Sequence, residues 1–287
     1  MCIFLTGCSG EQDNNEALKQ KTLAEVDYIG NKIITTINML NNITLDNYIV
    51  SSKSVEFQAE GSQSTSEGSK EGTVSSNQSQ SSQTQNNSQG QAQGSQNENP
   101  MVVTEMSQHN ILTTNTEEIN WNLIKQEVEL INDAWGIVVL DLYEQETNNE
   151  QVLEFSTILD YTIMSVNSES KEETLNNLAS LYAVLPKYLQ QIGAEESKQN
   201  ISKINSNMLK AYSIVNQPNW IEVSNNLQQV EQDFLKLMED VNYVSKNEHK
   251  VKQVYVEFKE LQNSLPNQNQ TLFYVKYKNL MQSLNTL

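Results

Sequence analysis

The sequence predicts an all-α protein built as a helical bundle. Large apolar residues recur at three- and four-residue steps over residues 14–50 and again over residues 114–287, which is the spacing of one helix face. Ser/Thr–x–x–Glu pairs, which often begin helices, precede several of these stretches. The 58–113 region between them is rich in Ser, Gln and Asn. Because most of it cannot bury enough apolar surface to offset its ordering entropy, we expect a disordered linker there.

The first helical stretch covers residues 14–50. Gly30 lies within its apolar stripe and lowers the helix propensity locally. A helix with one apolar face needs a partner, which is either the folded body or a second copy of the same helix. The stripe consists of Leu23, Val26, Ile29, Ile33, Ile37 and Leu40.

The folded body is predicted to begin near Thr114, where Thr114 with Glu117 has capping-box spacing and Asn115 with Glu118 repeats it. Asn148-Asn149 is expected to separate the first body helix from the second. The first helix has its apolar stripe at Trp121, Ile124, Val128, Ile131, Trp135, Val138 and Leu142, and the second at Val152, Phe155, Leu159, Ile163 and Val166.

Two further helices are expected before residue 218. Ser170 and Glu173 have capping-box spacing and are predicted to open the third helix. Pro186 should kink that helix or end its regular part, and Gly193 is a suitable C-terminal cap. The fourth helix is predicted to begin at Glu195 and to stop at Pro218.

The body then repeats its apolar pattern. Asn219-Trp220 follows Asn120-Trp121 by 99 residues, and the apolar phase of the next two helices is kept at the same offset. We therefore predict a duplicated three-helix unit, with repeats at 117–192 and 216–287 and a connecting helix between them. The alternative is that two unrelated bundles share the same helical periodicity.

Composition excludes several function classes. The net charge is −18 and the chain has no arginine, so a nucleic-acid partner is not expected. The two histidines, His109 and His249, lack the spacing of metal ligands, and no nucleophile motif or phosphate-binding glycine loop is present. We expect no cofactor, no metal site and no catalytic activity.

Five residues are candidates for a ligand or partner surface. Trp121, Trp135 and Trp220 are in phase with aliphatic residues, so they are either core anchors or the lining of a cleft between the repeats. Asp141 and its repeat partner Asp240 lie beside the apolar face, late in their helices, where the helix dipole disfavours an anion. Each is expected to form a flanking ion pair or to be solvated; the alternative is that it binds a polar ligand.

The N-terminus carries a short motif, Leu5-Thr6-Gly7-Cys8, followed by polar residues. It resembles the lipobox of bacterial lipoproteins. The resemblance implies that residues 1–7 are the end of a truncated signal peptide. It also implies that Cys8 carries diacylglyceryl and fatty-acyl groups such as palmitate, which anchor residues 8–57 on the extracytoplasmic face of the cell membrane.

These features suggest two functions. The first is a membrane-anchored, non-catalytic lipoprotein whose helical domain binds a protein partner in the cell envelope, with the linker as a spacer. The alternative is an extracytoplasmic small-molecule receptor whose ligand lies between the two repeats. An enclosed pocket with a few converging polar groups would favour the receptor, whereas an open apolar or charged groove would favour the interaction domain.

Overall fold

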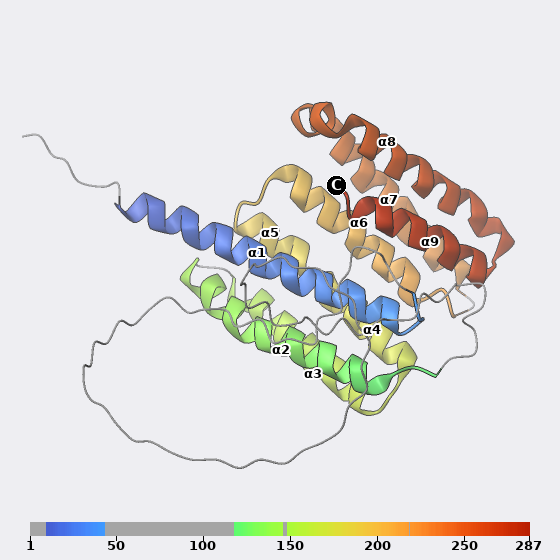
Figure 1. The fold of residues 1–287 in the computed structure, drawn as a ribbon, viewed down its shortest axis with the longest axis horizontal. Coiled ribbons are helices and arrows are strands. Elements are labelled where there is room, and N and C mark those ends of the chain that lie inside the picture. Colours follow the sequence, from blue (N-terminus) through green and yellow to red (C-terminus); the bar gives the residue numbers. More distant parts are fainter. Residues whose placement is uncertain (1–9, 44–117, 146–147, 218) are drawn as a thin grey trace, which may run out of the picture. The chain divides into compact units, whose positions relative to one another are not determined.

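The computed structural model describes residues 10–43, 118–145, 148–217 and 219–287. All regular elements in these ranges are helices (Figure 1), so the predicted all-α class is confirmed. The lipobox, Cys8, His109 and the predicted linker at 58–113 lie outside the described residues. The described helices belong to one compact unit.

The N-terminal helix α1 spans Gly10–Met39, so the predicted continuation of this helix is wrong over residues 40–43. The chain leaves the helix because Asn42 takes a left-handed conformation with φ of 53°. The amide of Ile43 then donates to the carbonyl of Asn38 and the amide of Asn42 to that of Met39, which is the Schellman arrangement. Residues 44–50 lie outside the described ranges.

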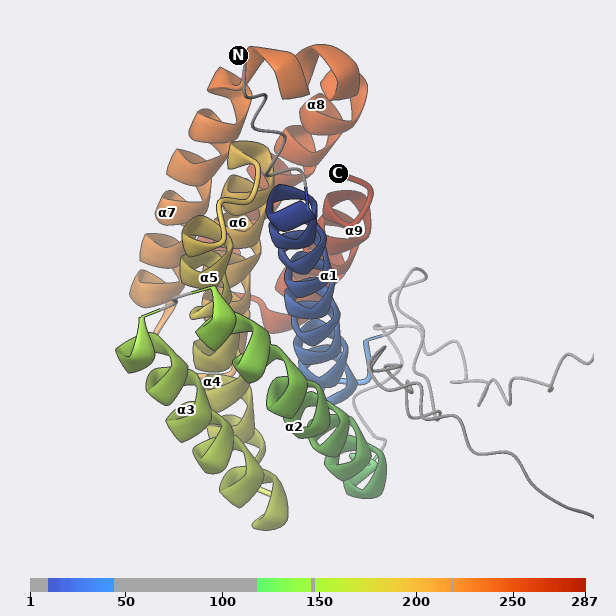
Figure 2. The same cartoon turned by 90° about the vertical axis from the view of Figure 1, so that its left-hand side faces the viewer.

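The partner of α1 is the folded body. Its apolar stripe is buried, with Ile29, Ile33 and Ile37 fully inaccessible to solvent. It packs against α2 (Trp121–Glu144), α4 (Lys171–Tyr182) and α5 (Leu185–Gln191), as Figures 1 and 2 show. The helix that precedes the linker in sequence is therefore part of the same core as the helices that follow it.

Local signals explain where the body helices begin and end. Helix α2 begins at Trp121 because the Asn120 side chain accepts from the amide of Leu123. The predicted capping box of Thr114 and Glu117 lies outside the described residues. Ser170 does precede α4, but its side chain makes no capping hydrogen bond. The predicted break at Pro186 is confirmed, because α4 ends at Tyr182 and the proline lies in the first turn of α5.

The remaining helices complete the core. Helix α3 (Asn149–Asn167) packs on α2 and α4, and α6 (Glu196–Ser213) packs on α4, α5 and α7 (Trp220–Glu239). Helix α8 (Val241–Ser264) continues into a 3₁₀ turn (Leu265–Asn267) and packs on α7 and α9 (Gln270–Leu284). The left-handed Gly193, with φ of 72°, ends the α5 segment as predicted.

The two candidate repeats correspond to α2–α5 and α7–α9, with α6 between them. Asn120 and Asn219 cap α2 and α7 in the same way, each accepting from the amide three residues later. Beyond that the two runs differ, because Asn148 caps α3 whereas Asn247 lies at a kink inside α8. The duplication stays a prediction.

Candidate functional site

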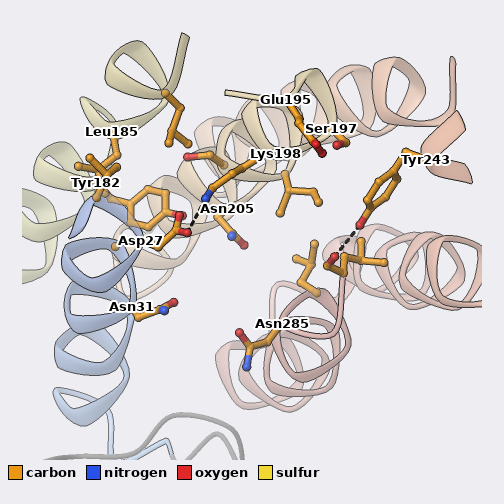
Figure 3. A pocket seen from close by; sticks show the side chains of 17 residues that line it. Asp27, Asn31, Tyr182, Leu185, Glu195, Ser197, Lys198, Asn205, Tyr243 and Asn285 are labelled. Carbon is orange, nitrogen blue, oxygen red and sulfur yellow. Dashed lines mark hydrogen bonds and ion pairs between the residues drawn. The ribbon is translucent and has the colours of Figure 1, made fainter. Parts of the chain in front are cut away.

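A pocket of about 390 Å³ lies where the candidate repeats, α6 and α1 meet (Figure 3). Its walls come from α1, from the α4–α5 segment, from α6 and from the ends of α8 and α9. The apolar part of the lining includes Val26, Leu185, Leu189, Ile201, Leu284 and Leu287. The polar part includes Asp27, Asn31, Glu195, Ser197, Lys198, Ser202, Asn205 and Asn285.

Gly30 allows α1 to lie close to the α4–α5 wall. A Cβ atom built at this position would be 3.3 Å from Leu185 Cδ1 and 3.3 Å from Tyr182 Cε2. This glycine, which lowers helix propensity in the sequence, therefore has a packing role in the structure. It places Asp27 and Asn31, one turn apart on α1, at the pocket.

One ion pair crosses the pocket wall between α1 and α6. Asp27 Oδ2 lies 2.5 Å from Lys198 Nζ, and both side chains are partly exposed, at 46% and 34%. Burial raises the pKa of the Asp27 carboxyl, and the Lys198 ammonium partly opposes that shift. Burial also raises the pKa of the neighbouring Tyr182 phenol to about 12, while Asn205 and Ser202 oppose the shift. Asp27 thus keeps contact with solvent while it pairs with Lys198.

Three carboxamides at the pocket come from separate helices (Figure 3). Asn31 belongs to α1, Asn205 to α6, and Asn285 follows the last residue of α9. The Oδ1 atom of Asn205 is shielded from solvent and has no hydrogen-bond partner among the described residues. Asn31 and Asn285 are exposed, so their carboxamides offer donors and an acceptor to a bound molecule.

Asp141 forms a buried ion pair rather than part of this pocket. Its carboxylate lies 2.9 Å from Lys21 Nζ of α1, and only 9% of its side chain is exposed. Glu25, also on α1, is buried beside it with 3% of its side chain exposed. Burial and the neighbouring Asp141 raise the pKa of Glu25 to about 7. The flanking ion pair expected for Asp141 is therefore present, and it fixes α1 to α2.

The other four sequence candidates lie apart from one another. Trp135 is buried against Phe155, with ring centroids 4.1 Å apart, and its indole N–H donates to Ser156. Trp121 is half-buried on the same helix, about 21 Å away along the axis at 1.5 Å per residue, and Trp220 packs near Phe273. Asp240 caps α8 by accepting from the amide of Tyr243. None of these residues lines the pocket.

Sequence reasoning missed the residues that form the pocket. Asp27 and Lys198 are 171 positions apart. The local sequence around each of them predicts only a charged residue on a solvated helix face. The one available signal was Gly30, because a glycine within an apolar helical stripe can mark a close approach between helices. Nothing in the sequence indicated which helix would make that approach.

The described residues contain neither a cluster of metal-ligating side chains nor a helix long and apolar enough to cross a membrane. His249 is exposed. Comparison with known proteins found no matching family model, no matching curated protein and no matching solved structure. Functional inference therefore rests on the pocket and on the lipobox resemblance.

Proposed function

We propose that this protein is an extracytoplasmic, lipid-anchored receptor for a small molecule, which it binds in the pocket between α1, α4–α5, α6 and α9. The observation that carries the proposal is the pocket itself. Its volume of about 390 Å³ is within the usual range of small-molecule sites, and its lining combines aliphatic side chains with polar groups from several helices. Such a site orients a ligand without requiring catalysis.

The lipid anchor is proposed from Leu5-Thr6-Gly7-Cys8. Because α1 begins at Gly10 and packs on the body, lipidation of Cys8 would hold the pocket close to the bilayer. In the sequence, residues 58–113 follow α1, so they would not lie between Cys8 and the first helix of the body. Radiolabelled palmitate should label the full-length precursor expressed in a lipoprotein-processing host, and Cys8→Ala should abolish the labelling.

Thermal unfolding of the full chain tests ligand binding. A compound that binds the native state raises its melting temperature, so a panel of envelope metabolites should contain at least one that does so. Gly30→Leu, which places a side chain against Tyr182 and Leu185, should remove the shift, whereas Gly136→Leu should keep it, because no atom lies within 4 Å of a Cβ at Gly136. A shift that survives Gly30→Leu, or a panel with no shift, would contradict the proposal.

A second candidate function is protein binding through α2 and α3. Several large apolar side chains on these helices are 47–64% exposed: Leu140, Tyr143, Leu153, Tyr161 and Met164. Exposed apolar residues of this kind mark interaction surfaces when they are contiguous. Cross-linking in intact cells should then capture a partner of the parent protein. The double variant Leu153→Ser with Met164→Ser should no longer be cross-linked to this partner. The control Val256→Ser, which changes an exposed apolar residue on α8, should still be cross-linked to it.

A further inference from the structure

We propose that a shared proton locks the first part of α1, residues 15–25, onto α2 at acidic pH, and that loss of this proton at neutral pH releases it. The latch consists of Glu25 on α1 and Asp141 on α2, with Lys21 beside both. It goes beyond the proposed receptor function, because it concerns how α1 is attached and not what the pocket binds. This part of α1 connects the proposed lipid anchor at Cys8 with the body, so the latch would set how freely the body moves relative to the membrane.

Two buried carboxyl groups meet at a single lysine. The Lys21 ammonium lies 2.9 Å from Asp141 Oδ2 and 3.6 Å from Glu25 Oε1. Only 9% of the Asp141 side chain and 3% of the Glu25 side chain are exposed. Neither oxygen of Glu25 accepts a hydrogen bond from the described residues. Buried polar atoms are normally hydrogen-bonded, and a proton held between the two carboxyl groups supplies the missing donor.

The charge balance of this cluster depends on that proton. When it is present, Glu25 donates to the Asp141 carboxylate, the carboxylate pairs with Lys21, and the cluster is neutral. When it is lost, two buried carboxylates face one ammonium, which leaves an uncompensated charge in a poorly hydrated place. Burial and then Asp141 raise the pKa of Glu25 to about 7, while Lys21 acts in the opposite direction. The proton is therefore lost near neutral pH.

The titration of this cluster depends on α1 and α2. Among the charged groups of the described residues, only Asp141 and Lys21 shift the pKa of Glu25. The charged residues that do not contribute include those on the other helices packed on α1 and those around a small polar pocket near its start. They are Lys171, Glu172 and Glu173 on α4, Lys187 on α5, which pairs with Glu154, Lys198 on α6, which pairs with Asp27, and Glu16, Lys19 and Glu144 at the polar pocket.

The first part of α1 has few other contacts that would hold it in place. The side chains of residues 15–21 are all exposed or half-buried, and Leu23 is the only buried apolar residue between them and Val26. The second part is held more firmly, by the buried ion pair of Lys32 with Glu127 and by the fully buried isoleucines of the apolar stripe. Loss of the proton should therefore open the first part of the helix and leave the second part in place.

Amide hydrogen exchange of the full chain at pH 5 and pH 7.5, corrected for intrinsic exchange rates, tests the inference. Opening returns the pKa of Glu25 from about 7 to its ordinary value of 4.5. The protection of the amides at residues 22–26 should therefore fall by roughly 50-fold between the two pH values. The protection at residues 33–37 should stay unchanged.

Three variants identify the groups responsible. Glu25→Gln removes the titrating carboxyl but keeps a donor for Asp141, so protection at residues 22–26 should be equal at the two pH values. Asp141→Asn should reduce the pH dependence without abolishing it, because burial is the larger cause of the raised pKa. The matched control Glu154→Gln, at a partly exposed ion pair, should keep the full dependence. Circular dichroism checks that each variant is folded.

Several outcomes would overturn the inference. Equal protection of residues 22–26 at the two pH values in the parent protein would show that no proton is shared. A pH dependence that Glu25→Gln retains would assign the effect to another group, and one that Asp141→Asn leaves at full size would remove Asp141 from the latch. An equal loss of protection at residues 33–37 would mean that the proton stabilises the whole fold and that the local latch does not exist.

Discussion

Lys32 of α1 and Glu127 of α2 form an ion pair that is almost completely buried. The Lys32 Nζ and Glu127 Oε2 atoms lie 2.9 Å apart, and the two side chains are 6% and 1% exposed. The lysine ammonium also lies 5.8 Å from the centre of the Tyr28 ring. The pair thus connects two helices that are separated in sequence by the whole linker region, and it fixes their register.

Removing one partner of this pair should destabilise the protein strongly. Glu127→Gln leaves the Lys32 charge buried and uncompensated, which typically costs about 3–5 kcal/mol. The double change Lys32→Met with Glu127→Leu should recover most of that loss, since an apolar pair of similar size needs no desolvation of charge. Urea unfolding measures both. Glu154→Gln, which breaks the partly exposed pair with Lys187, should change the free energy by about 0.5 kcal/mol or less.

Glu25 should make stability depend on pH. Its pKa rises from 4.5 to about 7 in the folded state, so between these values the native protein holds a proton that the unfolded chain has released. The free energy of unfolding should therefore fall as pH rises from 4.5 to 7, by roughly 3 kcal/mol from this group. Glu25→Gln should be less pH-sensitive over that window in urea unfolding. A parallel profile for the two proteins would show that Glu25 titrates normally.

The two helical glycines should respond differently to alanine. Gly136→Ala should raise the free energy of unfolding by about 0.5–1 kcal/mol, because alanine favours the helix and nothing lies near its Cβ. At Gly30 the new Cβ meets Leu185 and Tyr182 at 3.3 Å, so crowding should cancel that gain. Thermal melts of both variants test this difference. Equal stabilisation would mean that α1 can move away from the α4–α5 wall without cost.

The helix caps provide a third comparison of stability. Asn120→Ala and Asn219→Ala each remove a side-chain acceptor from a helix N-terminus and should cost about 1 kcal/mol. Ser170→Ala should cost clearly less, because the Ser170 side chain makes no capping hydrogen bond. Chemical unfolding of the three variants measures these losses of stability. An equal loss for Ser170→Ala would mean that the Ser170 side chain does cap α4, as the capping-box spacing predicts.

Much of the fold could be predicted from local patterns. The stripe over Ile29, Ile33 and Ile37, the break at Pro186 and the cap at Gly193 follow from helical periodicity and backbone geometry, which act over a few residues. The errors were also local. Helix α1 ends at Met39, earlier than predicted, because Asn42 adopts a left-handed conformation. The Ser170 capping box, although correctly spaced, makes no side-chain hydrogen bond.

The candidate site was not predictable in the same way. The ion pair expected for Asp141 is present, but its partner Lys21 is 120 positions away and could not be identified from local sequence. The tryptophans pack in different parts of the core. The pocket residues Asp27, Lys198 and Asn285 carry no shared motif. Their meeting depends on how α1 packs against helices that follow it by more than a hundred residues, and no local pattern encodes that arrangement.

The sequence by itself determined the helical class, most helix positions and the acidic net charge, because each depends on composition or on short-range spacing. Only the tertiary structure decided that α1 belongs to the core of the body, that Lys32 and Glu127 are buried together, and that a pocket forms beside Gly30. These features depend on the packing of segments distant in sequence, where many weak contacts and a few buried charges select one arrangement.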